Sequence, residues 1–129
     1  MRRVLPWTPA VLWAGVIFWL SSRPTLPGPD VPHLDKAAHF GAYAVLGALL
    51  AFATDRRGLP LALAAALGVL YGALDEVHQM YVPGRSPDPL DWAADTAGVA
   101  AACVLYSLWR SRRAPARTAG SGETSVSRA

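Results

Sequence analysis

Four apolar runs divide this sequence, and they constrain its fold more than any other feature. They occupy residues 4–20, 37–54, 59–74 and 92–109. A bilayer core requires about 20 apolar residues per helix. To span it, the second helix must include His39, the third must extend through Asp75 and Glu76, and the fourth must include Asp95. The chain is 53% hydrophobic and 16% charged, against about 45–50% and about 25% in soluble domains. The sequence therefore predicts an all-α fold, an integral membrane bundle of four transmembrane helices.

The first run also has features of a secretory signal peptide. The basic residues Arg2 and Arg3 precede it, as in the positive region of such a peptide. However, the segment SSRP at residues 21–24 follows the run, where a signal peptide would have a small-residue cleavage site. We therefore interpret the run as an uncleaved first transmembrane helix.

Proline, glycine and polar residues separate the four runs. Residues 21–34 contain four prolines, residues 55–58 form a polar turn, and residues 82–90 form a second Pro-rich bend. This pattern predicts one four-helix membrane domain over residues 1–110. Residues 111–129 are rich in Ser, Arg, Gly and Thr, with too little apolar surface to pack. They are expected to form a disordered basic and polar tail.

The basic residues are distributed asymmetrically along the four predicted helices. Nine of the 12 fall on the side of both termini and the second loop: Arg2, Arg3, Arg56, Arg57, Arg110, Arg112, Arg113, Arg117 and Arg128. Cytoplasmic loops of membrane proteins carry such an excess of Lys and Arg. We therefore expect a multi-pass protein of the inner (cytoplasmic) membrane with both termini in the cytoplasm. This topology explains the net charge of +3 without a nucleic-acid partner.

Polar side chains gather at the other end of the predicted bundle. Spacings of four residues place them on shared helix faces, and three helix ends meet there if the bundle is compact. The sequence predicts a candidate site made of Asp35, His39, Asp75, Glu76, His78, Gln79, Arg85, Asp91 and Asp95. Ionisable groups within membrane segments are costly and usually reflect function.

Some of these groups also have a purely structural interpretation. Asp35 and Asp91 stand near predicted helix starts, where a carboxylate can cap the free N–H groups. Asp95 lies a full turn inside an apolar helix and needs a partner, for which His39 and Arg85 are the nearest candidates. A satisfied core histidine and a structural ion pair therefore remain alternatives to a working site.

The residue types suit more than one chemistry. An Asp–His pair can move a proton, because the carboxylate fixes the tautomer of the imidazole. Carboxylates and histidine can also hold a divalent cation, but the spacing matches no compact metal motif such as HExxH, so metal binding is left open. The sequence contains no GxGxxG, P-loop or GxSxG motif, and no cofactor is expected. Cys103 is interpreted as a small buried apolar residue.

The motifs at these positions resemble the VanZ-like family of small bacterial membrane proteins. The matching segments, in the family's order, are WLSS (19–22), DKAAHFGAY (35–43), DEVHQ (75–79), PGR (83–85) and DWAADTAG (91–98). Asn often stands in the family where this chain has Asp95. The resemblance implies a four-helix integral membrane protein. The name-giving member is associated with low-level teicoplanin resistance, but the resemblance supplies no reaction.

Two functional hypotheses follow. In the first, the polar site binds or modifies a lipid- or peptidoglycan-linked substrate of the cell envelope and thereby affects glycopeptide susceptibility. His39 with Asp75 or Glu76 would do acid–base work, Arg85 would hold a phosphate or carboxylate, and Asp35 and Asp95 would orient them. The partners would be membrane lipid, a lipid-linked envelope precursor or an envelope protein.

In the second hypothesis, the protein is a non-catalytic structural or partner-binding membrane protein. The polar cluster is then an interhelical lock made of hydrogen bonds and ion pairs. A proton-coupled transporter fits less well, because the other halves of the second and third runs contain no polar residues. The sequence leaves open whether the protein is an enzyme and what its oligomeric state is.

Overall fold

The computed structural model describes residues 4–24 and 34–113, and these contain helices but no strand. A short 3-10 helix, η1 (Leu5–Trp7), leads into α1 (Thr8–Ser21). The other helices are α2 (Leu34–Arg56), α3 (Leu61–Gln79) and α4 (Pro89–Arg113). The prediction of an all-α chain with four helices is confirmed.

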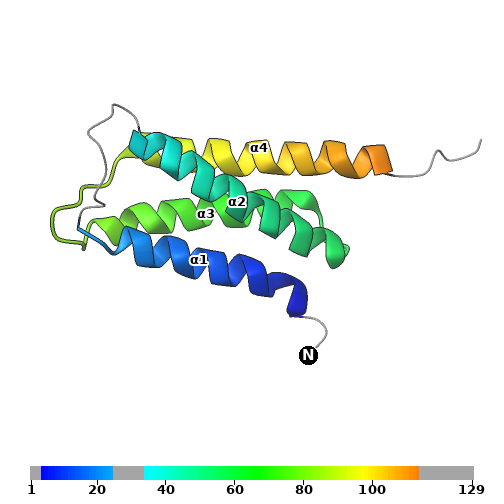
Figure 1. The fold of residues 1–129 in the computed structure, drawn as a ribbon, viewed down its shortest axis with the longest axis horizontal. Helices are drawn as coiled ribbons and strands as arrows, with labels where there is room; N and C mark the ends of the chain where they lie inside the picture. Colours follow the sequence, from blue (N-terminus) through cyan, green and yellow to red (C-terminus); the bar gives the residue numbers. More distant parts are fainter. Residues whose placement is uncertain (1–3, 25–33, 114–129) are drawn as a thin grey trace, which may run out of the picture.

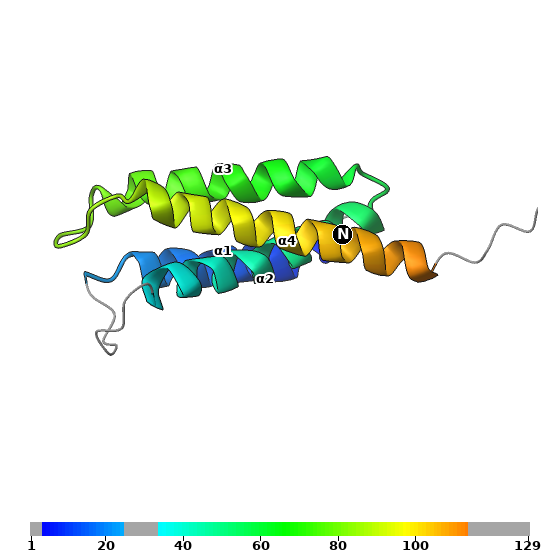
Figure 2. The same cartoon turned by 90° about the horizontal axis from the view of Figure 1, so that it is seen from above.

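The four helices lie alongside one another, and successive helices run in opposite directions (Figure 1). Helices α1 and α3 end, and α2 and α4 begin, at one end of the bundle. The start of α1, the turn between α2 and α3, and the end of α4 lie at the opposite end (Figure 1). Seen from above, α3 lies on one side of the bundle and α1 and α2 on the other, with α4 in front of them (Figure 2). Helix α2 also packs directly against α3. The most extensive helix contact is that between α2 and α4.

Local sequence signals set the helix boundaries. Gly58 adopts a positive φ of 66°, which ends α2 in a tight turn that glycine tolerates at no steric cost. Pro60, with extended backbone, precedes the first turn of α3. Asp88 caps α4, because its Oδ1 accepts a hydrogen bond of 2.9 Å from the Leu90 N–H. Asp91, which was considered as the cap, lies within the first turn instead.

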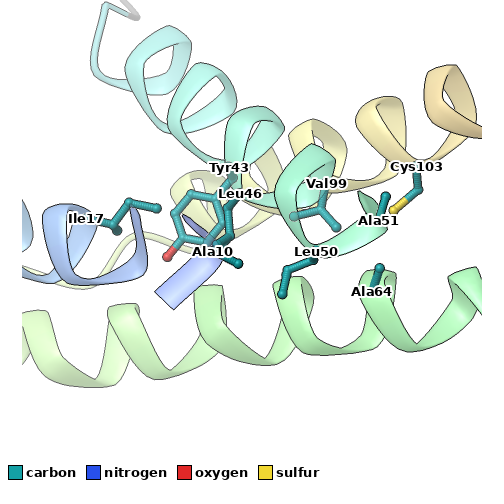
Figure 3. Packing of buried hydrophobic residues seen from close by; sticks show 9 residues of the cluster. All are labelled: Ala10, Ile17, Tyr43, Leu46, Leu50, Ala51, Ala64, Val99 and Cys103. Atoms are coloured by element: carbon teal, nitrogen blue, oxygen red, sulfur yellow. The ribbon is translucent and has the colours of Figure 1, made fainter. Parts of the chain in front are cut away.

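Buried apolar side chains from all four helices form one core (Figure 3). The buried cluster consists of Ala10, Ile17, Tyr43, Leu46, Leu50, Ala51, Ala64, Val99 and Cys103. Cys103 occupies it as a small apolar residue, as predicted. The backbones of α2 and α4 approach closely at Gly98, where an added Cβ would collide with the Phe40 carbonyl. Small residues at helix interfaces permit such approach in membrane proteins.

Two helices, α2 and α3, are long and apolar enough to cross a membrane. Helix α1 together with η1 is apolar but shorter, and the apolar stretch of α4 is interrupted by Asp95 and rich in Ala. Large apolar side chains that are more than half exposed cover the outside of the bundle: Val11, Leu12, Phe18, Leu70, Leu74, Val104, Leu105 and Leu108. The expectation of four spanning helices is thus met for two of them by length and composition.

Helix α4 continues to Arg113, three residues beyond the boundary predicted for the membrane domain. The rest of the predicted tail, residues 114–129, lies outside the described residues. So do residues 1–3 and most of the Pro-rich segment between the first two helices. The proposed cytoplasmic residues Arg2, Arg3, Arg117 and Arg128 are among them.

Candidate functional site

All nine predicted site residues lie toward one end of the bundle, which we call the polar end. It is formed by the last turns of α1 and α3, the first turns of α2 and α4, and the bend between α3 and α4, at the left in Figure 1. Asp75, Glu76, Gln79, Asp91 and Asp95 are all buried there, between 0% and 9% exposed. The prediction that three helix ends converge at this end is confirmed.

Lys36 links α2 to the start of α4 through three carboxylates. Its Nζ lies 2.6 Å from Asp88 Oδ2, 2.6 Å from Asp91 Oδ1 and 2.9 Å from Asp35 Oδ2. The Lys36 ammonium holds the pKa of the partly exposed Asp88 carboxyl below its ordinary value. Neither Lys36 nor Asp88 was among the predicted site residues, although both stand next to helix starts that the sequence identified.

His39 is the partner of the buried Asp95. The His39 Nδ1 and Asp95 Oδ1 atoms are 2.9 Å apart, and Asp95 is 0% exposed. The other ring nitrogen, Nε2, lies 3.8 Å from Asp91 Oδ2. An ionised Asp95 would therefore place the ring proton on Nδ1. Of the two partners predicted for Asp95, the structure selects His39 over Arg85.

Glu76 faces the same group of side chains from α3. Its Oε2 accepts a hydrogen bond of 2.7 Å from the Asp88 backbone N–H. Its second oxygen, Oε1, is buried and has no hydrogen-bond partner among the described residues, and neither has Asp95 Oδ2. The hydroxyl of Tyr43 is also buried and unpartnered there, and it points toward α3 (Figure 3). His39, Glu76 and Asp95 offer potential metal ligands that lie within 4.8 Å of one another.

Two further contacts join α3 to the end of α1. Gln79 donates hydrogen bonds to Ser21 Oγ at 3.1 Å and to Asp75 Oδ2 at 3.4 Å, which confirms that Asp75 and Gln79 share a face. His78 does not join them, because its Nε2 lies 3.0 Å from Ser22 Oγ. Its ring packs 4.5 Å from that of Phe18. The spacing rule could not reveal these serine partners, because they belong to another helix.

Arg85 is held in the bend between α3 and α4. Gly84 has a φ of 81°, and the Arg85 N–H donates to the Val82 carbonyl at 3.1 Å, which closes a turn that requires a glycine-like conformation at its third position. Within residues 4–24 and 34–113, Arg85 forms no ion pair. Its side chain is therefore a cation of the polar end that lacks a carboxylate partner in this part of the chain. Arg23, at the end of α1, also lacks an ion pair there, but its guanidinium stacks on the Trp19 ring at 3.8 Å.

Arg85 and His39 line two neighbouring cavities. The first, of about 80 Å³, has a mainly apolar wall from α1 and α2, formed by Ile17, Leu20, Ala38 and Ala42. Its polar lining includes Tyr43 and Asp75. The second, of about 420 Å³, has a polar wall that includes Asp35, Gln79, Ser86, Asp88 and Asp91. An anionic group with an apolar chain attached could contact both cavities at their shared residues.

Comparison with known protein families agrees with the motifs of this end. The family model described as VanZ/LLP1 matches residues 5–110. This range includes all nine predicted site residues and most of the four helices. No curated protein and no solved structure matches the chain. The resemblance seen in the sequence motifs is confirmed.

Proposed function

Because the chain belongs to the VanZ/LLP1 family, we propose that it is a multi-pass inner-membrane protein that acts on the cell envelope. Its polar end binds or modifies a lipid- or peptidoglycan-linked substrate. The observation that carries this proposal is Arg85, a cation without an ion pair in the described residues, beside buried carboxylates and His39. In a purely structural lock, each buried or partly buried charge would be expected to have an oppositely charged partner.

The proposed membrane placement has all four helices spanning and both termini in the cytoplasm. It is supported by the large apolar side chains exposed along the bundle, because a water-exposed surface rarely carries so many. The polar end would then face outward, and the end that carries Arg56, Arg57, Arg110, Arg112 and Arg113 would face the cytoplasm.

Reporter fusions test this topology. A reporter that is active only in the cytoplasm should work when fused after residue 113 or inserted in the turn at Gly58, and it should fail when inserted at Ser86. Activity at Ser86 with none at the other two sites would reverse the orientation. Activity at only one of residues 113 and 58 would mean that α3 and α4 do not both span.

The proposed substrate has an anionic headgroup and an apolar chain. Arginine recognises phosphate and carboxylate through paired hydrogen bonds, and Arg85 lies where the polar and the apolar cavity meet. His39 and Asp75 line the cavities beside Arg85 and would exchange protons with a bound headgroup. Glu76, Asp35 and Asp95 would hold this arrangement in place. Changes in the supply of such envelope precursors would alter susceptibility to glycopeptide antibiotics.

Binding of a defined lipid tests the role of Arg85. Purified protein in nanodiscs should be stabilised against heating by a polyprenyl phosphate but not by the polyprenol of the same length. The variant Arg85→Gln should lose most of this stabilisation, whereas Arg110→Gln, which changes an arginine at the opposite end, should keep it. Equal stabilisation by the phosphate and the alcohol would mean that the headgroup is not recognised, and the proposal would fail.

The alternative function is that of a structural or partner-binding membrane protein. Lys36 favours it, because its contacts to Asp88 and Asp91 tie α2 to α4, and so does the His39–Asp95 pair. In that case isosteric variants of His39, Glu76 and Arg85 would all lower the stability of the bundle, and envelope phenotypes would follow stability alone.

A further inference from the structure

We propose that His39, Glu76 and Asp95 bind one divalent metal ion at the polar end. This inference rests on the proposed function and deepens it, because the ion would lie in the same site as the anionic headgroup. The three side chains come from α2, α3 and α4 respectively, so the ion would connect three helices at their shared end.

The distances suit a single ion. Neighbouring ligands of an octahedral ion lie about 3 Å apart, and opposite ligands about 4.2 Å apart, when each metal–ligand distance is about 2.1 Å. His39 Nδ1 and Asp95 Oδ1 are 2.9 Å apart, and all three ligand atoms lie within 4.8 Å of one another. Small side-chain rotations would therefore bring the three groups onto one ion, which would replace the proton between His39 and Asp95.

Unpartnered buried oxygens point to the ion independently of these distances. Asp95 is 0% exposed and Glu76 is 9% exposed, yet Asp95 Oδ2 and Glu76 Oε1 have no hydrogen-bond partner among the described residues. A buried polar atom that lacks a partner costs about 1–3 kcal/mol, and more when the group is charged. Coordination through Glu76 Oε1 and through both oxygens of Asp95 would satisfy these two atoms.

The surroundings of the three residues resemble the outer shell of a metal site. Metal-bound histidines usually direct the second ring nitrogen at a carboxylate, and bound carboxylates are themselves hydrogen-bonded. His39 Nε2 faces Asp91 Oδ2 at 3.8 Å. Glu76 Oε2 accepts a hydrogen bond of 2.7 Å from the Asp88 N–H, so Oε1 is the oxygen that remains available to a ligand. Glu76 is therefore already held by a group outside the triad, and Asp91 lies close to the second nitrogen of His39 without bonding it in the metal-free protein.

The balance of charge at this end also favours a cation. Six carboxylates gather there: Asp35, Asp75, Glu76, Asp88, Asp91 and Asp95. The permanent cations described there are Lys36, which is engaged by three of the six, Arg85, and Arg23, which stacks on the Trp19 ring. A divalent ion beside Glu76 and Asp95 would offset the excess of negative charge in a poorly solvated environment.

One imidazole and two carboxylates favour Mn²⁺ or Zn²⁺. Imidazole nitrogen suits first-row transition metals, and Ca²⁺ prefers a larger set of oxygen ligands. Three protein ligands leave open positions on either metal. A phosphate or carboxylate oxygen of the headgroup could occupy one of these positions while Arg85 holds another oxygen of the same group.

Direct binding of Mn²⁺ tests this site without any substrate or phenotype. The full-length protein is purified in detergent, stripped with a chelator and titrated with Mn²⁺ alone, while free Mn²⁺ is followed by its electron paramagnetic resonance signal. We expect about one Mn²⁺ per chain and displacement by Zn²⁺. The variants His39→Gln and Glu76→Gln should each weaken binding at least about tenfold, whereas Asp55→Asn, which changes a carboxylate at the opposite end of the bundle, should bind as the wild type does.

Two results would overturn the inference: no binding of Mn²⁺ or Zn²⁺ to the folded wild-type chain, or binding that survives in both triad variants. Should those variants unfold, the wild-type complex still decides the matter. Pulsed resonance spectra must then show a histidine nitrogen coupled to Mn²⁺, and their failure to do so would exclude the site. Because only metal is added, a negative result leaves lipid recognition by Arg85 standing, and loss of lipid recognition leaves the metal result standing.

Discussion

The two ends of the bundle both carry charged residues, but they pair them differently. At the opposite end, Asp55 has a partner for each oxygen: Arg110 Nη1 at 2.6 Å and the Tyr106 hydroxyl at 3.0 Å. The Arg110 side chain is 59% exposed, so solvent supports the pair. At the polar end, Asp95 and Glu76 are buried and each keeps one oxygen without a partner in the described residues.

This difference separates structural pairing from a site prepared for a ligand. A carboxylate that is fully paired at a helix end needs nothing more and contributes modestly to stability. Buried carboxylates with free oxygens are costly in the unliganded protein. Their presence in a small bundle is explained most simply by a ligand that binds the unpartnered oxygens.

The largest expected effect comes from removing the ammonium of Lys36. In Lys36→Met, three carboxylates lose their shared cation, and the buried Asp91 is left without a permanent positive charge. We expect a loss of about 2–3 kcal/mol in the free energy of unfolding, measured by thermal unfolding in detergent. The matched change at the opposite end, Arg110→Met, should cost at most about 1 kcal/mol, because that pair is exposed. Equal costs at the two ends would remove the contrast between them.

Smaller effects on stability, of opposite sign at the two ends, are expected from Asp→Asn changes at the buried Asp95 and at the partly exposed Asp55. Asp95→Asn keeps a hydrogen-bond acceptor for His39 but removes a buried charge, so the bundle should be unchanged or more stable by about 1 kcal/mol. Asp55→Asn removes the ion pair with Arg110 and should lower stability by up to about 1 kcal/mol. Clear destabilisation by Asp95→Asn in metal-free protein would instead identify the His39–Asp95 pair as a lock.

The smallest effect concerns pH. The ammonium of Lys36 lowers the pKa of Asp88 below the ordinary value of an aspartate. A lowered folded-state pKa stabilises the protein above the unfolded pKa of about 3.9, and this contribution is lost as the pH falls through the folded value. The melting temperature of the wild type should therefore fall more between pH 5 and pH 3 than that of Asp88→Asn, in which asparagine still caps α4. Parallel pH profiles would mean that the Asp88–Lys36 pair does not persist in solution.

The sequence predicted the helices and the convergence of the site better than it predicted individual partners. Apolar runs and Pro-rich breaks determine where helices form, and spacing within one helix correctly placed Asp75 beside Gln79. Partners across helices depend on how each helix is rotated about its axis. The sequence therefore could not distinguish His39 from Arg85 as the partner of Asp95, or pair His78 with Ser22.

Backbone groups account for a further part of what the sequence did not reveal. The hydrogen bond from the Asp88 N–H to Glu76 depends on the path of the bend between α3 and α4, which no side-chain pattern encodes. The central position of Lys36 was missed for a related reason. Its three partners belong to two segments more than 50 residues apart, and only the packed bundle brings them together.

The most direct test of the account compares stability and envelope phenotype in one matched pair of variants, Glu76→Gln and Asp55→Asn. Each variant exchanges one carboxylate for its amide, at the polar end and at the opposite end respectively. The account predicts that Glu76→Gln melts within a few degrees of the wild type in detergent yet loses the effect of the protein on sensitivity to envelope antibiotics. Asp55→Asn should keep that effect despite a small loss of stability. A phenotype that followed melting temperature in both variants would contradict a working site at the polar end and identify its charges as a structural lock.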